Sequence, residues 1–164
     1  MSRILDIGCG NNKTESAVGI DINPDTEADI IHNLNHFPYP FNDNEFDVVV
    51  CKQILEHLDD VGKVMDEIYR ISRKSAKVII EVPHFSCYYA FGDPEHKHFF
   101  SYFSTNFLTR KGKFTVIKNE ITFHKSFRRY NLHRLFNKCP RAYERFWTFI
   151  IPAEHLHFEL KVLK

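Results

Sequence analysis

The sequence predicts an α/β protein with a Rossmann-like, doubly wound sheet, and two short segments near its start carry that prediction. The first is the apolar strand Ile4–Ile7, which runs directly into a glycine turn at Gly8 and Gly10. A short apolar run bounded by a turn signal is typical of a strand buried on both faces of a parallel sheet. The second is Val18–Asp21, which ends in a carboxylate. Polar groups therefore collect where two neighbouring strands end, as they do in nucleotide-binding sheets.

Five further strands are expected, each an apolar run bounded by turn residues or a segment of alternating apolar and polar residues. They cover residues 28–32, 46–51, 76–82, 114–123 and 156–162. Asp59 or Asp60 caps a helix that begins at Val61, since apolar residues then recur at helical spacing as far as Ile71. Shorter helices are expected around residues 104–108, 132–136 and 140–150.

The glycine turn by itself also fits a nicotinamide or flavin dinucleotide site, but two features argue against it. That fingerprint needs a third glycine and a helix whose first turn faces a pyrophosphate. Here Asn11, Asn12 and Lys13 follow Gly10, and only seven residues separate Gly10 from the next strand. The first crossover helix is therefore shortened or missing, and an adenosine ligand without a pyrophosphate fits better.

Length and composition favour one domain that spans residues 1–164. The chain has 43% hydrophobic residues and 16 phenylalanines, enough for a single packed core. The four scattered cysteines form no C-x-x-C pair, which favours a reducing, cytoplasmic compartment. We find no signal-peptide pattern and no apolar run near the length of a membrane span.

Charge is distributed unevenly along the chain, although the net charge is only +1. Residues 1–95 hold 8 basic and 17 acidic side chains, whereas residues 96–145 hold 12 basic and 2 acidic ones. Residues 110–145 could thus attract nucleic acid or another anionic substrate, or could form a solvated helix face. The basic side chains of the C-terminal part of this segment are Arg128, Arg129, Arg134, Lys138, Arg141 and Arg145.

In its first half the sequence resembles the class I S-adenosylmethionine-dependent methyltransferases, in particular the small group called methyltransferase type 11. The matching segments, in the family's order, are Leu5-Asp6-Ile7-Gly8-Cys9-Gly10, Gly19-Ile20-Asp21, Phe37-Pro38-Tyr39-Pro40-Phe41, Phe46-Asp47-Val48-Val49-Val50, Leu55-Glu56-His57-Leu58 and Val78-Ile79-Ile80-Glu81-Val82-Pro83. Several weak motifs in order are stronger than one glycine motif alone. The resemblance implies a seven-stranded sheet of order 3-2-1-4-5-7-6 with the last strand antiparallel, and S-adenosylmethionine as cofactor.

The resemblance also assigns a cofactor site. Asp21 would hold the ribose, Asn33 and Leu34 would flank the adenine, and residues 51–53 would line the methionine side. Asn33 departs from the acidic residue that is common at this position, but its amide can still pair with the adenine amino group. The cofactor-binding residues assigned are Asp6, Gly8, Cys9, Gly10, Asp21, Ile22, Asn33, Leu34, Cys51, Lys52 and Gln53.

The methyl acceptor is expected to approach the segment that follows the strand ending at Pro83. His84, His96 and His98 are its side chains that can take a proton near neutral pH, and they are the predicted catalytic residues. The Asp93–His98 run also contains residue types that ligate metals, so a substrate pocket, a hydrogen-bonded turn and a metal site remain three interpretations. We assign no metal ligand. His57 matches a position common across the family and is interpreted as structural or cofactor-side.

The predicted function is S-adenosylmethionine-dependent transfer of a methyl group to an unidentified acceptor, which would be anionic if the basic segment binds it. A base amino group is a poor candidate, because Cys51-Lys52-Gln53-Ile54 stands where the exocyclic-amine methylases carry an Asn/Asp-Pro-Pro-aromatic motif. A non-catalytic protein that binds a partner or an anionic polymer is one alternative, and an aminopropyl transferase is another. The basic helical insertion at about residues 126–152 is expected to select the substrate. The missing first helix predicts an open cofactor pocket, which a partner subunit or the substrate itself would close, and an exposed aromatic surface in residues 85–107 would indicate a homodimer.

Overall fold

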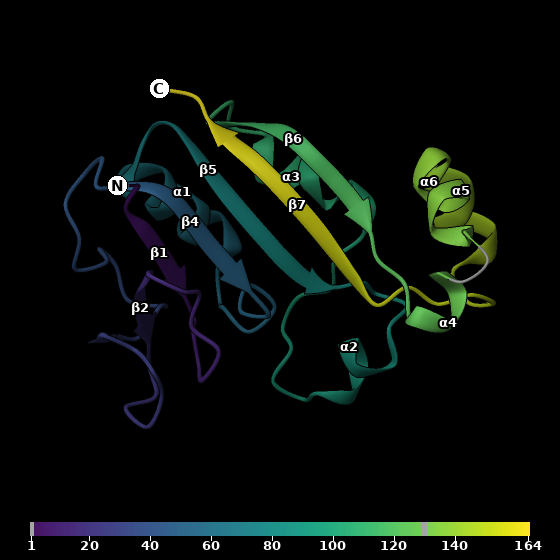
Figure 1. Cartoon of the computed structure of the whole chain (residues 1–164), viewed down its shortest axis with the longest axis horizontal. Helices are drawn as coiled ribbons and strands as arrows, with labels where there is room; N and C mark the ends of the chain where they lie inside the picture. Colours follow the sequence, from purple (N-terminus) through teal and green to yellow (C-terminus); the bar gives the residue numbers. More distant parts are fainter. Residues whose placement is uncertain (1, 129–130) are drawn as a thin grey trace.

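The fold is seen in a computed structural model, which describes residues 2–128 and 131–164. Its centre is a seven-stranded sheet of order β3-β2-β1-β4-β5-β7-β6, in which β7 runs antiparallel to β5 and β6 (Figure 1). The predicted strand order and direction are confirmed. The strands are β1 (Ile4–Ile7), β2 (Val18–Asp21), β3 (Ile30–Ile31), β4 (Phe46–Lys52), β5 (Ser72–Pro83), β6 (Phe114–Ile121) and β7 (His155–Val162).

Helices follow only the later strands. Between β1 and β2, and from β2 through β3 to β4, the chain forms turns and loops, so the first crossover helix is missing as predicted. The longest helix starts where Asp60 accepts a hydrogen bond from the Lys63 amide at 3.0 Å, which satisfies a free amide of its first turn. The helical segments are α1 (Val61–Ile71), α2 (Tyr88–Gly92), η1 (Tyr102–Ser104), α3 (Thr105–Thr109), α4 (Lys125–Arg128), α5 (Leu132–Lys138), α6 (Pro140–Ala142) and the π-helix η2 (Tyr143–Trp147).

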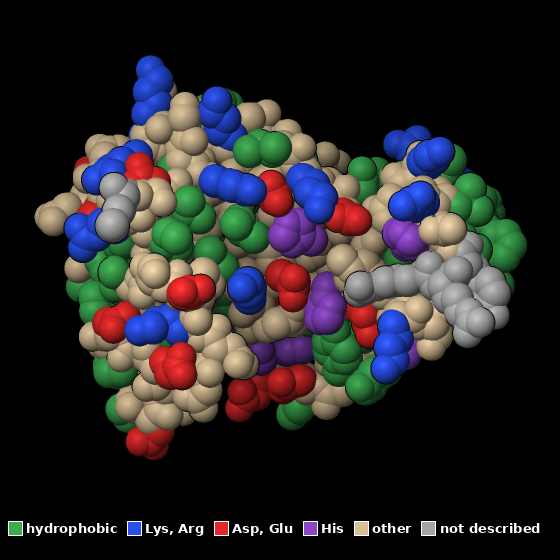
Figure 2. All heavy atoms as spheres, viewed as in Figure 1, with side chains coloured by type: hydrophobic (Ala, Val, Ile, Leu, Met, Phe, Trp, Pro, Cys, Tyr) green, Lys and Arg blue, Asp and Glu red, His purple; other side chains and the backbone are tan. Residues whose placement is uncertain are grey.

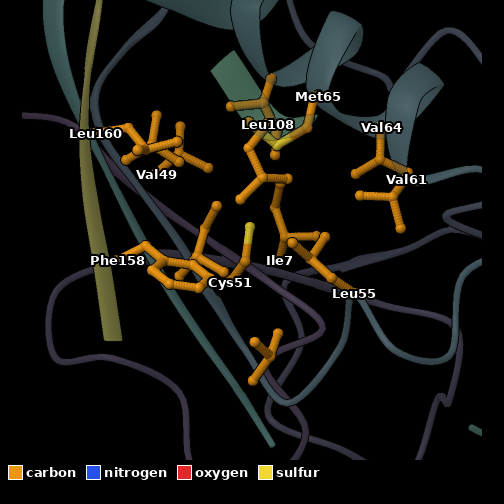
Figure 3. Packing of buried hydrophobic residues seen from close by; sticks show 14 of the residues in the cluster. Ile7, Val49, Cys51, Leu55, Val61, Val64, Met65, Leu108, Phe158 and Leu160 are labelled. Carbon is orange, nitrogen blue, oxygen red and sulfur yellow. The ribbon is translucent and has the colours of Figure 1, made fainter. Parts of the chain in front are cut away.

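The core lies between the sheet and the helices α1 and α3, which both cover its rear face in Figure 1. Burying each large apolar side chain there contributes roughly 1.5–3 kcal/mol. Figure 3 shows how side chains from both layers meet. The labelled residues are Ile7, Val49, Cys51, Phe158 and Leu160 from the strands, Leu55 from the turn after β4, and Val61, Val64, Met65 and Leu108 from the helices.

Within the described residues, no helix covers the front face of the sheet (Figure 1). Strands β5 and β7 alternate buried apolar residues with polar ones, and the polar side chains line this face (Figure 2). Lys77 of β5 pairs with Glu159 of β7 at 2.7 Å, and Glu81 lies opposite His157 in the register. Because side chains alternate between the two faces, the face that no helix covers carries polar side chains and can contact water.

The insertion between β6 and β7 forms a small helical lobe at the far end of the sheet (Figure 1). It is attached by ring packing, because Tyr143 lies 5.2 Å from Phe123 and 4.7 Å from Phe136 between ring centroids. Met1, Arg129 and Tyr130 lie outside the described residues, as does the side chain of Arg128. The exposed residues of the lobe include the basic Arg134, Lys138, Arg141 and Arg145 and the apolar Leu135, Phe146, Trp147, Phe149 and Ile150. In the described part of the chain, every helix is too short or too polar to cross a bilayer.

Candidate functional site

The two glycines of the first turn serve different purposes. Gly8 has φ 69°, and a Cβ added there would lie 2.4 Å from Ile54 Cγ1, so this glycine lets the turn pack against the segment after β4. Gly10 has φ 50°, and a Cβ added there would meet nothing within 4 Å. Gly10 therefore faces open space at the end of β1, and a ligand lying across that strand end can approach its backbone closely.

Asp21, at the end of β2, lies directly beside this space. Its Oδ2 accepts a hydrogen bond from the Gly10 amide at 3.0 Å, and its Oδ1 accepts one from the Asn23 amide at 3.0 Å. These two bonds fix the carboxylate at the adjoining ends of two parallel strands, with lone pairs still available to a ribose. The next residue, Ile22, is 60% exposed, which leaves an apolar surface beside the carboxylate.

Asp6 supports the turn from inside. It is 2% exposed and accepts a hydrogen bond from the Thr14 amide at 2.7 Å, which holds the helix-free loop after Gly10 against β1. Cys9 is also buried, and burial with the nearby Asp21 carboxylate raises the pKa of its thiol. Both residues shape the backbone of the site.

One residue of this region was missed by the sequence reasoning. Asp29 accepts hydrogen bonds from the Gly19 amide at 2.7 Å and from Lys13 Nζ at 3.0 Å. These bonds lower the pKa of the Asp29 carboxyl, and the bond from the Gly19 amide has the largest effect. A carboxylate directly before a short edge strand has no distinctive sequence signal, so its contact with β2 was visible only in the fold.

Asn33 and Leu34, the predicted adenine neighbours, follow β3. The side-chain oxygen of Asn33 accepts a hydrogen bond from the Asn35 amide at 3.0 Å, while Leu34 is 4% exposed and its carbonyl accepts one from the Tyr39 hydroxyl. Asn33 thus has its amide NH₂ left to donate. Their roles toward adenine stay predictions.

Cys51 and Lys52 end β4 and Gln53 follows it, beside the glycine turn, because β4 pairs with β1 and Cys51 lies opposite Ile7. Cys51 is fully buried, and burial raises the pKa of its thiol, so it is a packing residue. Lys52 is exposed. Gln53 has φ 52°, an uncommon conformation for a residue other than glycine, and its side-chain nitrogen is buried without a partner.

These features fit S-adenosylmethionine. The open space over Gly10 would let the cofactor lie against the backbone, and Asp21 would accept hydrogen bonds from its ribose hydroxyls. The Gln53 side-chain amide is a buried donor with no acceptor among the described residues. The three strand ends that carry these groups, β1, β2 and β4, are adjacent in the sheet. Asp6, Cys9 and Cys51 are buried around these groups, whereas Ile22 and Lys52 are exposed beside them.

The three predicted catalytic histidines do not come together in one cluster. His84 is fully buried, its Nδ1 lies 2.8 Å from the Ser86 hydroxyl, and its Nε2 lies 3.2 Å from Glu144 Oε1. His98 Nε2 donates to the Leu58 carbonyl at 2.8 Å. A proton-transfer role for either stays a prediction, and these ring nitrogens already have protein partners.

His96 lies instead beside two residues from the turn after β4. One potential ligand atom from each of Glu56, His57 and His96 lies within 4.8 Å of the other two. Burial raises the pKa of the Glu56 carboxyl to about 7, and burial together with His96 lowers the pKa of His57. The sequence reasoning treated His57 and His96 separately, because 38 residues stand between them and only the fold brings them together.

Comparisons with known proteins agree with this architecture. Residues 5–80 match the family model described as a methyltransferase domain. An uncharacterized protein of Methanocaldococcus jannaschii, MJ0638, is 34% identical over 92 residues. That match covers 48% of this chain but only 40% of the archaeal protein, so the chain spans less than half of the relative's length.

Solved structures share the fold over the whole chain. A SAM-dependent methyltransferase from Archaeoglobus fulgidus has a TM-score of 0.72 at 19% identity, covering 98% of this chain and 86% of its own. An S-adenosylmethionine-dependent methyltransferase from Mesorhizobium loti has a TM-score of 0.64 at 14% identity, covering 98% and 90%. A chain in a complex that contains the Trm112 methyltransferase activator of Haloferax volcanii has a TM-score of 0.66 at 15% identity, covering 99% and 83%. The chain is thus similar to methyltransferases in two ways: residues 5–80 match the methyltransferase domain model, and the whole chain shares the fold of solved S-adenosylmethionine-dependent methyltransferases.

Proposed function

We propose that this protein transfers a methyl group from S-adenosylmethionine to an anionic acceptor. The observation that carries the proposal is the open space over Gly10 with the Asp21 carboxylate fixed beside it at the ends of β1 and β2. When bound, S-adenosylmethionine supplies a methyl group on a sulfonium, which is displaced in line. The chain's task is then to hold cofactor and acceptor in line and to exclude water.

The acceptor side is proposed to be the segment between β5 and α3. It follows a strand end next to β4 and carries exposed aromatic rings, with Tyr88 86% exposed and Phe91 stacked on Phe99 at 4.3 Å between centroids. Exposed aromatic rings near a site can pack against a planar substrate or a cation. His84 links this segment to the helical lobe, because its ring contacts Glu144 of the lobe.

The anionic character of the acceptor is inferred from the helical lobe. Arg134, Lys138, Arg141 and Arg145 are exposed, and none forms an ion pair with a carboxylate among the described residues. Unpaired exposed cations attract anions over several ångströms and less so at high salt. This supports nucleic acid or another polyanion as the acceptor.

The alternative is a non-catalytic protein of the same fold that binds a partner. The exposed apolar residues of the lobe favour it, because Phe149 and Ile150 are 84% and 69% exposed. One structural neighbour comes from a complex with a methyltransferase activator, which supports a partner subunit here too.

Methyl transfer is tested with S-adenosylmethionine labelled in its methyl group. The full chain is incubated with RNA, DNA, acidic proteins and anionic metabolites, and label in each class is counted. We expect label in an anionic class, about tenfold less with Arg141→Gln/Arg145→Gln, since two charge-assisted contacts are lost. The matched control Lys63→Gln/Lys74→Gln removes two exposed cations elsewhere and should leave transfer unchanged. Saturable cofactor binding without transfer to any class would favour the non-catalytic alternative.

A further inference from the structure

Two loops at the carboxyl end of the sheet are tied together around Glu56. This residue lies in the turn after β4, and its backbone carbonyl accepts hydrogen bonds from the Lys97 amide at 2.7 Å and the His98 amide at 3.2 Å. The segment after α2 is therefore fixed onto the turn after β4. That contact brings the side chains of Glu56, His57 and His96 into one cluster.

The Glu56 side chain forms no hydrogen bond with another residue in the described part of the chain. The residue is 1% exposed, and both carboxylate oxygens are buried without a hydrogen bond. Leaving a buried charged group unpaired costs several kcal/mol, so natural proteins pair such a group or use it to bind an ion. Its oxygens lie instead beside imidazole nitrogens.

His96 is arranged as a metal ligand would be. Its Nδ1 lies 2.9 Å from the Ala90 carbonyl oxygen, which only accepts, so the Nδ1 proton is donated there. In the neutral ring, Nε2 then carries the free lone pair. A metal-binding histidine is commonly oriented in this way, by donating its other N–H to a backbone carbonyl.

His57 completes the cluster from the same turn as Glu56. Its ring meets that of His96 edge to face, with centroids 4.6 Å apart and an interplanar angle of 70°. Two cationic imidazoles at this separation would repel each other, whereas two neutral ones present lone pairs. At the rim of the cluster, Asp93 Oδ2 lies 3.8 Å from His96 Nε2.

We propose that Glu56, His57 and His96 bind a divalent first-row transition-metal ion such as Zn²⁺, Mn²⁺ or Fe²⁺. Two imidazole nitrogens with one carboxylate form a donor set suited to these ions, whereas Mg²⁺ and Ca²⁺ prefer oxygen ligands alone. Three protein ligands leave coordination positions open to water, a substrate oxygen or Asp93. The site uses other residues than the Gly10 and Asp21 cradle, and the proposal does not depend on methyl transfer. This proposal departs from the sequence-based assignment, which named no metal ligand.

The site is tested on the full chain after treatment with a chelator, by calorimetric titration with Zn²⁺ and by absorption spectroscopy with Co²⁺. We expect one ion per chain and a Co²⁺ spectrum of nitrogen and oxygen ligation. Glu56→Gln and His96→Gln should each weaken binding by about 100-fold or more. Replacing a residue that only hydrogen-bonds to a metal ligand already weakens binding by about 10–100-fold, and losing a ligand should weaken it at least as much. Glu95→Gln removes an exposed carboxylate from the same segment and should bind like the unchanged chain.

A measurement on the unchanged chain keeps the test decisive if a variant fails to fold. Side-chain nitrogen NMR of the histidines should show that Zn²⁺ shifts the signals of His57 and His96 and leaves those of the exposed His124 unchanged. No stoichiometric binding by folded protein would overturn the proposal. So would binding that is unaffected in both ligand variants, or shifts confined to other histidines.

Discussion

The Gly10 amide donates a 3.0 Å hydrogen bond to Oδ2 of Asp21, and this bond joins the ends of the first two strands. In many doubly wound sheets a crossover helix positions these strands. Here the chain between Ile7 and Val18 is a loop, so hydrogen bonds from loop amides take over the helix's positioning role. The carboxylate that should hold the ribose is therefore also part of the turn's own structure.

The two turn glycines should respond differently to alanine. Gly8→Ala is expected to destabilise the fold by about 2–4 kcal/mol, because it adds a clash with Ile54 to the strain of a positive φ. Gly10→Ala should cost only about 1–2 kcal/mol, since its Cβ enters open space, but it should weaken S-adenosylmethionine binding. Urea unfolding and calorimetric titration measure the two effects.

A second substitution checks the cause assigned to Gly8. The double variant Gly8→Ala/Ile54→Ala removes the clashing side chain, so it should be less destabilised than the sum of the two single variants. Additive effects would show that the clash contributes nothing. Equal loss of stability in Gly8→Ala and Gly10→Ala would contradict the division of roles.

Arg70 should stabilise the proline-rich loop before β4. It bonds to the buried Glu67 carboxylate at 2.6 Å and to the carbonyl oxygens of Tyr39 and Phe41. Arg70→Ala leaves Glu67 without its cation and should destabilise the protein by about 2–3 kcal/mol. Arg73→Ala is the matched control, because its pair with Asp47 is half exposed and should contribute less than about 1 kcal/mol. Equal losses in urea unfolding would contradict this account.

Asp29 should make a pH-dependent contribution to stability. The Gly19 amide and Lys13 lower its pKa in the folded state, so the folded protein favours the charged form. The stabilisation is therefore present above the pKa of about 3.9 for an unfolded aspartate and is lost as pH falls through the folded value. The difference in unfolding free energy between the unchanged chain and Asp29→Asn should be largest near pH 7 and should shrink below about pH 4. A difference that grows in acid would have the wrong sign.

Local signals predicted most of the fold. The helix Val61–Ile71 was placed correctly, since an aspartate cap and a stripe at helical spacing both belong to that segment. Strand β5 is longer than predicted, because Ser72 pairs with Phe46 beyond the register shift with β4. Strand β3 is shorter, with Ile30 and Ile31 alone paired to β2 at the sheet edge. The ends of these strands are set by pairing with neighbouring strands, which the sequence of one segment does not determine.

The site was predicted less evenly than the fold. Gly10 and Asp21 stand next to strand ends in the sequence, so their proximity followed from a parallel sheet. The cluster of Glu56, His57 and His96 depends on a backbone contact between two loops, which no pattern of residues announces. The sequence likewise did not predict which face of the sheet the helices cover, because that depends on how the helices are arranged in space.

Calorimetric titration of the full chain with S-adenosylmethionine and S-adenosylhomocysteine tests the central claim most directly. The account predicts saturable binding of both, weakened at least about tenfold by Asp21→Ala, because a ribose loses a charged hydrogen-bond acceptor. The exposed Asp25→Ala, four residues further along, should bind like the unchanged chain. Absence of binding by folded protein, or equal affinity in Asp21→Ala, would contradict the claim that the ends of β1 and β2 form the cofactor site.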